Sequence, residues 1–142
     1  MKQLFFLFIV CCATPLFGQQ WEEDFSQAQE KGFEEQKKLL LVFSGSDWCI
    51  PCIRLEKEVW QDSTFLAYAK ENLVLYRADF PKRKKNQLAP ELKAKHEILA
   101  AQYNPQGYFP WVVVFGKDKS VKGNFVYTKD PVSQYIKQIK SF

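Results

Sequence analysis

The feature that most constrains the fold is the sequence Trp-Cys-Ile-Pro-Cys at residues 48–52, which places two cysteines three residues apart. An unbroken apolar run at residues 39–43 precedes it, and a short turn of small and polar residues joins the two. The residues after Cys52 have a helical pattern. Two cysteines at the start of a helix can face the same way and close a small disulfide ring. The stretch therefore predicts a strand, a tight turn and a redox-active pair at the mouth of a helix.

The first residues are typical of an export signal. Lys2 is followed by an apolar stretch over residues 4–10, and Ala13 and Gly18 are small residues of the kind that precede a cleavage site. The apolar stretch is too short to cross a bilayer. We expect residues 1–18 to be a signal peptide, with Ala13 as the alternative cleavage position. Residues 19–142 would then form a single exported domain, periplasmic or secreted.

The number and spacing of the cysteines favour a redox-active pair over a structural disulfide. The chain has four cysteines, and removal of the leader would take away Cys11 and Cys12. The remaining pair is too close to contribute much loop-closure entropy as a disulfide. A zinc site needs four ligands, and the single histidine, His96, lies at a spacing that favours packing in the core or a place on the surface. We therefore expect no metal.

The hydrophobic pattern predicts an α/β protein. Apolar runs at 39–43 and 111–115 predict strands that are buried on both faces, residues 73–78 predict a further strand, and the alternating segment 121–127 predicts an edge strand. Helical spacing is found over residues 21–38, with Gly32 as its end or fraying point, and over 49–60, 64–72, 88–103 and 132–140. This order predicts a mixed sheet with helices on both faces.

Residues 38–52 resemble the strand, loop and WCxxC helix of the thioredoxin superfamily, and Phe109-Pro110 resembles the cis-proline that opens its next central strand. Residues 43–49 and 52–56 are similar to small exported thioredoxin-like proteins of bacteria and to the C-terminal domain of the periplasmic thiol–disulfide interchange protein. The resemblance implies a thioredoxin fold, with a central mixed sheet of four to five strands.

The chemistry of such a pair requires a thiolate. A free thiol has a pKa of about 8.5, and lowering it to about 7 takes roughly 2 kcal/mol of stabilisation. We expect Cys49, first in the pair and nearest solvent, to be the nucleophile that forms a mixed disulfide. Cys52, one turn further and more buried, is expected to resolve it.

Cys52 must lose its proton to attack. Glu56 is the first candidate acceptor, because it lies four residues after Cys52 on the same helical face, where the interchange-protein relative also has a glutamate. The alternative for Glu56 is a solvated residue that pairs with Lys57 or Arg54. Asp47 is the second candidate. The buried aspartate that thioredoxin carries on its central strand has no counterpart here.

Five residues are candidates for substrate binding. Trp48 is expected to cover the rim of the site, and a cis peptide at Pro110 would leave backbone groups free to pair with an extended substrate. Phe109 is bulkier than the residue usual at that position. The pair Ile50-Pro51 carries no charge, which favours a reducing poise.

The sequence thus predicts an exported thiol–disulfide oxidoreductase that reduces protein disulfides. It would use no cofactor beyond the Cys49–Cys52 disulfide, act as a monomer, and receive electrons from a membrane thiol–disulfide donor. The alternatives are a disulfide oxidase or isomerase, and a binding or chaperone module without redox turnover. The net charge of +4 is too mild to indicate a nucleic-acid partner. Residues 82–85 are interpreted as a solvated loop, with a docking patch for an acidic partner or an anionic membrane face as the alternative.

Overall fold

A computed structural model describes residues 20–142. The predicted signal peptide and its cleavage positions therefore lie outside the described residues. Among residues 20–142, no helix is both long enough and apolar enough to cross a membrane.

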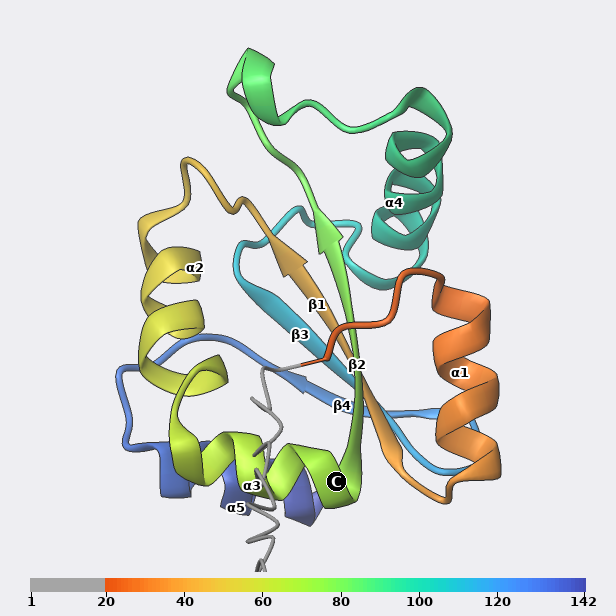
Figure 1. The fold of residues 1–142 in the computed structure, drawn as a ribbon, viewed down its shortest axis with the longest axis vertical. Helices are drawn as coiled ribbons and strands as arrows, with labels where there is room; N and C mark the ends of the chain where they lie inside the picture. Colours follow the sequence, from red (N-terminus) through yellow and green to blue (C-terminus); the bar gives the residue numbers. More distant parts are fainter. Residues whose placement is uncertain (1–19) are drawn as a thin grey trace, which may run out of the picture.

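A four-stranded mixed sheet forms the centre of the fold (Figure 1). The strands lie in the order β2-β1-β3-β4. β1 pairs with β2 in parallel and with β3 in antiparallel, and β3 pairs with β4 in antiparallel. The predicted mixed sheet is confirmed, with β4 at one edge as the alternating pattern indicated. The strand bounds are β1 Lys38–Ser44, β2 Leu73–Asp79, β3 Trp111–Phe115 and β4 Val121–Phe125.

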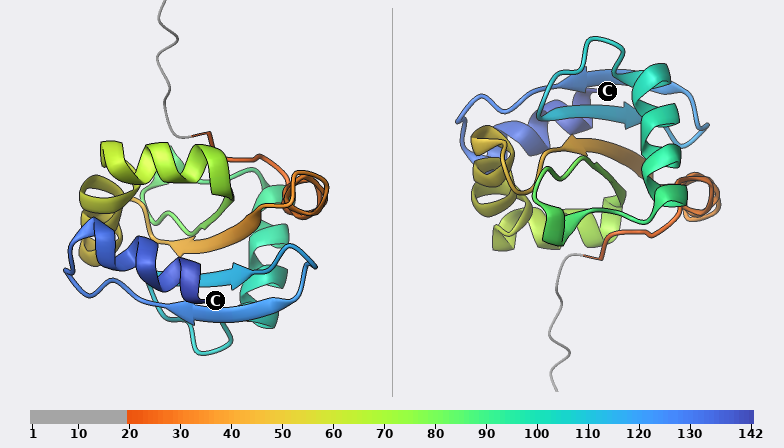
Figure 2. Two further views of the ribbon diagram at one scale, coloured as in Figure 1. Left: turned by 90° about the horizontal axis from the view of Figure 1, so that it is seen from below. Right: turned by 90° about the horizontal axis from the view of Figure 1, so that it is seen from above.

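Helices cover both faces of the sheet, which confirms the α/β prediction. Figure 2 shows α1 and α4 on one face and α2, α3 and α5 on the other. The helical bounds are α1 Phe25–Glu34, α2 Ile50–Leu55, the π-helix η1 Glu56–Trp60, α3 Ser63–Asn72, the 3-10 helix η2 Lys84–Asn86, α4 Pro90–Tyr103 and α5 Val132–Ser141.

The central strand β1 supplies both halves of the core. Leu40 and Val42 point into the cluster beneath α2, α3 and α5, whereas Leu39, Leu41 and Phe43 point into the cluster beneath α1 and α4. None of the five is more than 2% exposed. Burying such a side chain contributes about 1.5–3 kcal/mol, which explains why an unbroken apolar run was needed here.

The N-terminal helix is shorter than predicted. Trp21 lies before α1, which starts at Phe25 because the side chain of Asp24 accepts the Gln27 N–H at 3.1 Å. Trp21 packs instead against Trp60, with ring centroids 6.3 Å apart. Gly32 does not end the helix either: it is buried within α1, where a Cβ would lie 3.2 Å from the carbonyl oxygen of Lys37.

The predicted single helix over residues 49–60 is divided in two. At Glu56 the α-helix changes to a π-helical turn, in which Gln61 N–H donates to the Glu56 carbonyl at 3.0 Å. A π turn accommodates one extra residue per turn and is frequent at functional sites. Here it buries both Val59 and Trp60 and leaves Glu56 at the junction, one turn beyond Cys52.

The sheet topology brings three loops to one end of the molecule. β1 and β2 run in parallel, so the turn after Ser44 and the loop after Asp79 leave the same end of the sheet (Figure 1). β3 runs the other way, so the loop before Trp111 enters at that end as well. Residues from three distant parts of the sequence therefore meet around Cys49.

Candidate active site

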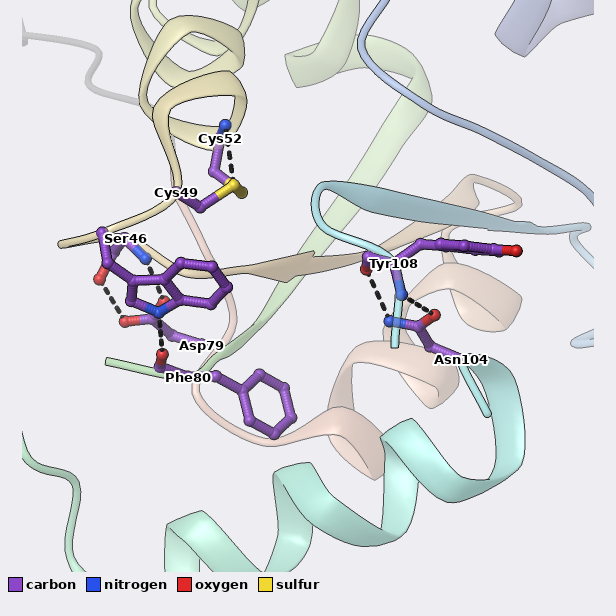
Figure 3. The surroundings of a disulfide bond; sticks show 8 residues. Ser46, Cys49, Cys52, Asp79, Phe80, Asn104 and Tyr108 are labelled. Atoms are coloured by element: carbon purple, nitrogen blue, oxygen red, sulfur yellow. Dashed lines mark hydrogen bonds between the residues drawn. A yellow bond between two sulfur atoms is a disulfide. The ribbon is translucent and has the colours of Figure 1, made fainter. Parts of the chain in front are cut away.

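Cys49 and Cys52 form a disulfide, with their Cα atoms 5.2 Å apart (Figure 3). Cys49 is the N-cap of α2, and its sulfur accepts the backbone N–H of Cys52 at 3.3 Å. Pro51 lies in the first turn of α2, where the absence of its N–H leaves no hydrogen bond unmade. The helix start therefore directs a donor at the sulfur of Cys49.

The two cysteines are almost equally buried in the disulfide form. Cys49 is 5% exposed and Cys52 is 4% exposed, so the predicted difference in burial between them is minimal. The asymmetry lies in hydrogen bonding, because the N-cap position belongs to Cys49 alone. Beside the disulfide, Ile50 is 61% exposed and Pro51 is also exposed, which gives the rim an apolar surface.

Trp48 connects the turn between β1 and α2, residues 45–49, which we call the cysteine turn, to the two neighbouring loops. Its indole N–H donates to the Phe80 carbonyl at 2.7 Å, and its ring packs edge-on against Phe109 at 5.6 Å. The ammonium of Lys82 lies 3.8 Å from the centre of the same ring. A Cβ at Gly45 would lie 2.4 Å from the indole, so only glycine leaves room for the ring there. Trp48 is half-buried in this position.

Two further contacts hold the turn against the end of β2. Ser46 donates its backbone N–H and its hydroxyl to the two carboxylate oxygens of Asp79, at 2.9 and 2.5 Å (Figure 3). Phe80, which follows, packs against Phe43 at 6.5 Å and against Phe109 at 5.5 Å. We call Phe43, Trp48, Phe80 and Phe109 the ring cluster.

The carboxylate of Asp47 is hydrogen-bonded to the loop after β2. One of its carboxylate oxygens accepts the Lys82 N–H, and the other accepts the Arg83 N–H and the side-chain amide of Asn86, each at 2.9 Å. These bonds, led by that from Lys82, hold the pKa of Asp47 below its ordinary range. A carboxylate with a lowered pKa is a weaker base, so Asp47 is poorly suited to accept a proton from Cys52.

Replacing Asp47 with alanine is expected to release the loop of residues 82–86 from the cysteine turn. Its folded-state pKa is lowered, so the contribution of Asp47 is present above the ordinary carboxyl pKa of about 3.9 and is lost as pH falls through the folded value. The protection factors of the Lys82 and Arg83 amides, which compare their exchange rates with those of unprotected amides at the same pH, should fall in the variant at neutral pH and in the wild type on strong acidification. Asp130→Ala, a change outside these loops, should leave both amides protected. Equal protection in wild type and Asp47→Ala would contradict this role.

Glu56 has a partner that the sequence did not indicate. Its carboxylate forms an ion pair with Arg77 of β2 and accepts the side-chain amide of Gln61 at 3.1 Å. The guanidinium of Arg77 also lies 4.1 Å from the centre of the Trp21 ring. The predicted alternative, pairing with Lys57 or Arg54, is wrong, because the ion pair of Glu56 is with Arg77 of β2. Its side chain remains 31% exposed.

The Phe109–Pro110 peptide bond is cis, as predicted, and Pro110 is buried. The loop before it is shaped by Asn104, which is 2% exposed. The Asn104 side-chain amide donates to the Tyr108 carbonyl at 2.8 Å and its oxygen accepts the Tyr108 N–H at 3.0 Å (Figure 3). Phe109 is thereby presented to Trp48 and Phe80. The binding of a substrate chain at Pro110 stays a prediction.

His96 belongs to the core, in agreement with the packing interpretation. It is 3% exposed, with Nδ1 2.9 Å from the Asp79 carbonyl and Nε2 3.1 Å from the Tyr76 hydroxyl. Burial lowers the pKa of His96. The neutral ring can satisfy both neighbours, donating to the carbonyl and accepting from the hydroxyl. Within residues 20–142, no group of three or more histidine, cysteine or carboxylate side chains is placed to hold a metal.

Comparison with known proteins identifies the family. A family model described as thioredoxin-like matches residues 20–117. The chain belongs to the thioredoxin-like family. Disulfide bond reductase DsbH of Chlamydia pneumoniae is 31% identical to this thioredoxin-like protein over 122 residues, which cover 86% of this chain and 71% of the relative.

Solved structures agree with this assignment. A structure of DsbH oxidoreductase superimposes with a TM-score of 0.79 and 28% identity, covering 90% of this chain and 88% of that one. The C-terminal domain of DsbD from Neisseria meningitidis, in its oxidised form, has a TM-score of 0.56 at 21% identity, covering 82% and 90% respectively, and shows the fold alone. Family membership and the Cys49–Cys52 disulfide together make the protein a thiol–disulfide oxidoreductase.

Several contacts around the site escaped the sequence reasoning. Arg77, Asp79, Phe80 and Lys82 come from β2 and the loop after it, more than 20 residues from the residues they contact in the cysteine turn and α2. The one available signal was the topology. Parallel pairing of the first two strands requires that their following loops meet, and polar residues at both strand ends could then have been paired.

Proposed function

We propose that this thioredoxin-like protein is an exported reductase of protein disulfides, with Cys49 as the attacking thiolate. The observation that carries the proposal is the N-cap position of Cys49, whose sulfur lies 3.3 Å from the Cys52 N–H. A hydrogen bond to the charged form of a thiol lowers its pKa, and the start of a helix favours negative charge. Cys52 has no comparable N-cap donor, so the roles of nucleophile and resolving thiol follow from this asymmetry.

The proposed cycle begins from the dithiol form. The Cys49 thiolate attacks one sulfur of a substrate disulfide, that S–S bond breaks, and the leaving sulfur takes up a proton. Cys52 then loses its proton and attacks the Cys49 sulfur, which breaks the mixed disulfide and releases the second substrate thiol. Two electrons and two protons pass to the substrate, and the protein ends in the disulfide form described above.

The reducing direction is supported by the similar protein DsbH, which is named a disulfide bond reductase, and by the uncharged Ile50-Pro51 pair. The decisive measurement is the midpoint potential of the Cys49–Cys52 couple by equilibration with glutathione. A value near that of thioredoxin, about −270 mV, supports the reductase. A value near that of the strong oxidant DsbA, about −120 mV, would establish an oxidase instead.

Export and the source of electrons belong to the same proposal. The leader pattern of residues 1–18 directs the domain out of the cytosol. In its new compartment, cytosolic reductants do not reach the domain. Each turnover leaves a disulfide, so a membrane thiol–disulfide donor must restore the dithiol. N-terminal sequencing of the protein recovered from its native compartment should give a chain that begins at Gln19, with no residues of the leader attached.

We further propose that Glu56 accepts the proton of Cys52 during resolution, with Asp47 the weaker candidate because its hydrogen bonds to the loop lower its pKa. Glu56 lies one turn after Cys52 and is held at the junction of α2 and η1 by Arg77. Arg77 is a positioning residue in this scheme, since it fixes the carboxylate and does not touch the sulfurs.

Glu56→Gln is expected to slow resolution without slowing formation of the mixed disulfide. At pH 7 a thiol of pKa about 8.5 is only about 3% thiolate, so loss of the acceptor can cost up to about 30-fold. The deficit should disappear above pH 9.5 or so, where the thiolate forms unaided. Quenched-flow trapping of the mixed disulfide measures both steps. Glu58→Gln, two residues along, is the matched control, and a deficit unaffected by pH would remove Glu56 from proton transfer.

A further inference from the structure

The loop after β2 carries four consecutive cations, Lys82-Arg83-Lys84-Lys85, all of them exposed. We call residues 82–85 the basic loop. Among the described residues, the side-chain salt bridges are formed by other lysines and arginines, and none involves the basic loop. The carboxylate of Asp47 accepts hydrogen bonds from the backbone of this loop, and its single negative charge is smaller than the four positive charges there. The loop thus presents positive charge outward.

This charge is held at a fixed place beside the redox site. Asp47 binds the Lys82 and Arg83 amides and Asn86, and the Gln87 side chain donates to the Pro81 and Arg83 carbonyls at 3.2 and 3.4 Å. Lys84 and Lys85 lie on the short 3-10 helix η2. Lys82 covers Trp48, the residue before Cys49. A loop that is merely solvated would need neither the contacts to Asp47 nor the contact to Trp48, both of which belong to the cysteine turn.

We propose that the basic loop is the recognition surface for an acidic segment that lies next to the disulfide of the partner protein. This rests on the proposed function, since it names the class of partner that the same site takes. Charges of one sign around a reaction site steer an oppositely charged partner and raise association rates by 10- to 1,000-fold at low salt. A partner whose acidic residues flank its disulfide meets the basic loop as its sulfur reaches Cys49.

An anionic membrane is the other ligand that such a loop attracts. The position of the basic loop beside the disulfide favours an acidic segment of a partner protein over a membrane. The loop projects from the end of the sheet at which α2 begins (Figure 1), and Cys49 is the N-cap of α2. A bilayer in contact with the loop would cover the approach to the disulfide. A narrow acidic segment leaves that approach open and uses it.

The test compares three disulfide-bonded peptides that differ only in whether aspartate, asparagine or lysine flanks the disulfide. The protein is reduced with dithiothreitol, freed of it, and mixed with each peptide, and the loss of peptide disulfide is followed by stopped-flow. We expect the aspartate peptide to react about tenfold faster than the asparagine peptide at low salt, and the lysine peptide to react slowest. The preference should shrink as salt shortens the Debye length to about 3 Å at 1 M.

The matched variants are Lys84→Glu with Lys85→Glu, and Lys129→Glu with Lys137→Glu. Both pairs change the net charge equally, and the second pair is exposed on the connection to α5 and on α5 itself, away from the basic loop. The first pair should lose or invert the preference for aspartate, and the second should keep it. A preference that survives the first pair, or equal rates for the aspartate and asparagine peptides in wild type, would overturn the proposal.

The outcomes separate this proposal from the one on which it rests. If wild type fails to reduce even the asparagine peptide, the reductase function itself fails. If it reduces all three peptides at one rate, only the basic-loop proposal fails. Sedimentation with phosphatidylserine vesicles completes the test: binding that Lys84→Glu with Lys85→Glu abolishes, together with equal peptide rates, would assign the loop to a membrane and overturn the acidic partner.

Discussion

Cys49→Ser is expected to abolish reduction of peptide and protein disulfides, with a loss of about 10³-fold or more. A serine hydroxyl is not ionised at neutral pH and cannot form the mixed disulfide, so the first step of the cycle disappears. Cys52→Ser should behave differently. Its Cys49 thiolate can still attack, but the mixed disulfide has no resolving thiol and should accumulate.

Trapping with a disulfide-bonded peptide, followed by mass spectrometry, distinguishes the two variants. The Cys52→Ser variant should gain the mass of one peptide half through Cys49, and the Cys49→Ser variant should gain none. Circular dichroism checks that both variants keep the secondary structure of the wild type. If the Cys52 thiol captured peptide faster than the Cys49 thiol, the assignment of the N-cap sulfur as nucleophile would be reversed.

Trp60→Ala is expected to lower the free energy of unfolding by about 3–5 kcal/mol, the largest effect on stability that we predict. Trp60 is 1% exposed, and its ring centroid lies 4.7 Å from that of Phe65 and 6.3 Å from that of Trp21. Truncation removes contacts to α3 and to the N-terminal segment and leaves a cavity under the π turn. Domains of this size are stable by only about 5–15 kcal/mol, so the variant should be close to unfolding.

Urea denaturation monitored by circular dichroism measures this loss. Ile98→Ala is the matched control, because Ile98 is also a large apolar residue but is 67% exposed on α4. Its effect should stay within about 0.5 kcal/mol. A loss below about 1 kcal/mol for Trp60→Ala would mean that the core relaxes into the space, contrary to the packing described for η1.

The elements that the sequence predicted well are those whose residues carry their own signal. The apolar runs that became β1 and β3 required burial on both faces, and the WCxxC motif identified the start of α2. The start of α3 is equally local, because the side chain of its N-cap Asp62 accepts the Thr64 and Phe65 amides at 2.8 and 3.2 Å. Each of these features depends on neighbours within a few residues.

The features that the sequence did not predict depend on contacts between distant residues. Trp21 fits a helical face by spacing, yet it lies outside α1, which is capped at Asp24, and packs against Trp60. For Glu56, the alternative to proton transfer was pairing with Lys57 or Arg54, but its carboxylate pairs with Arg77 of β2. The carboxylate of Asp47 was considered for catalysis, but it is used by amides 35 and 36 residues away. No local pattern encodes such pairings.

The ring cluster has a consequence for which substrates the enzyme can accept. Its four aromatic side chains join the cysteine turn, the loop after β2 and the loop before β3, so none of the three can shift alone. Binding then requires little ordering on the enzyme's side, and the adaptation must come from the partner. Disulfides in pliant segments, such as tails and long surface excursions, should therefore be attacked in preference to those fixed inside a rigid fold.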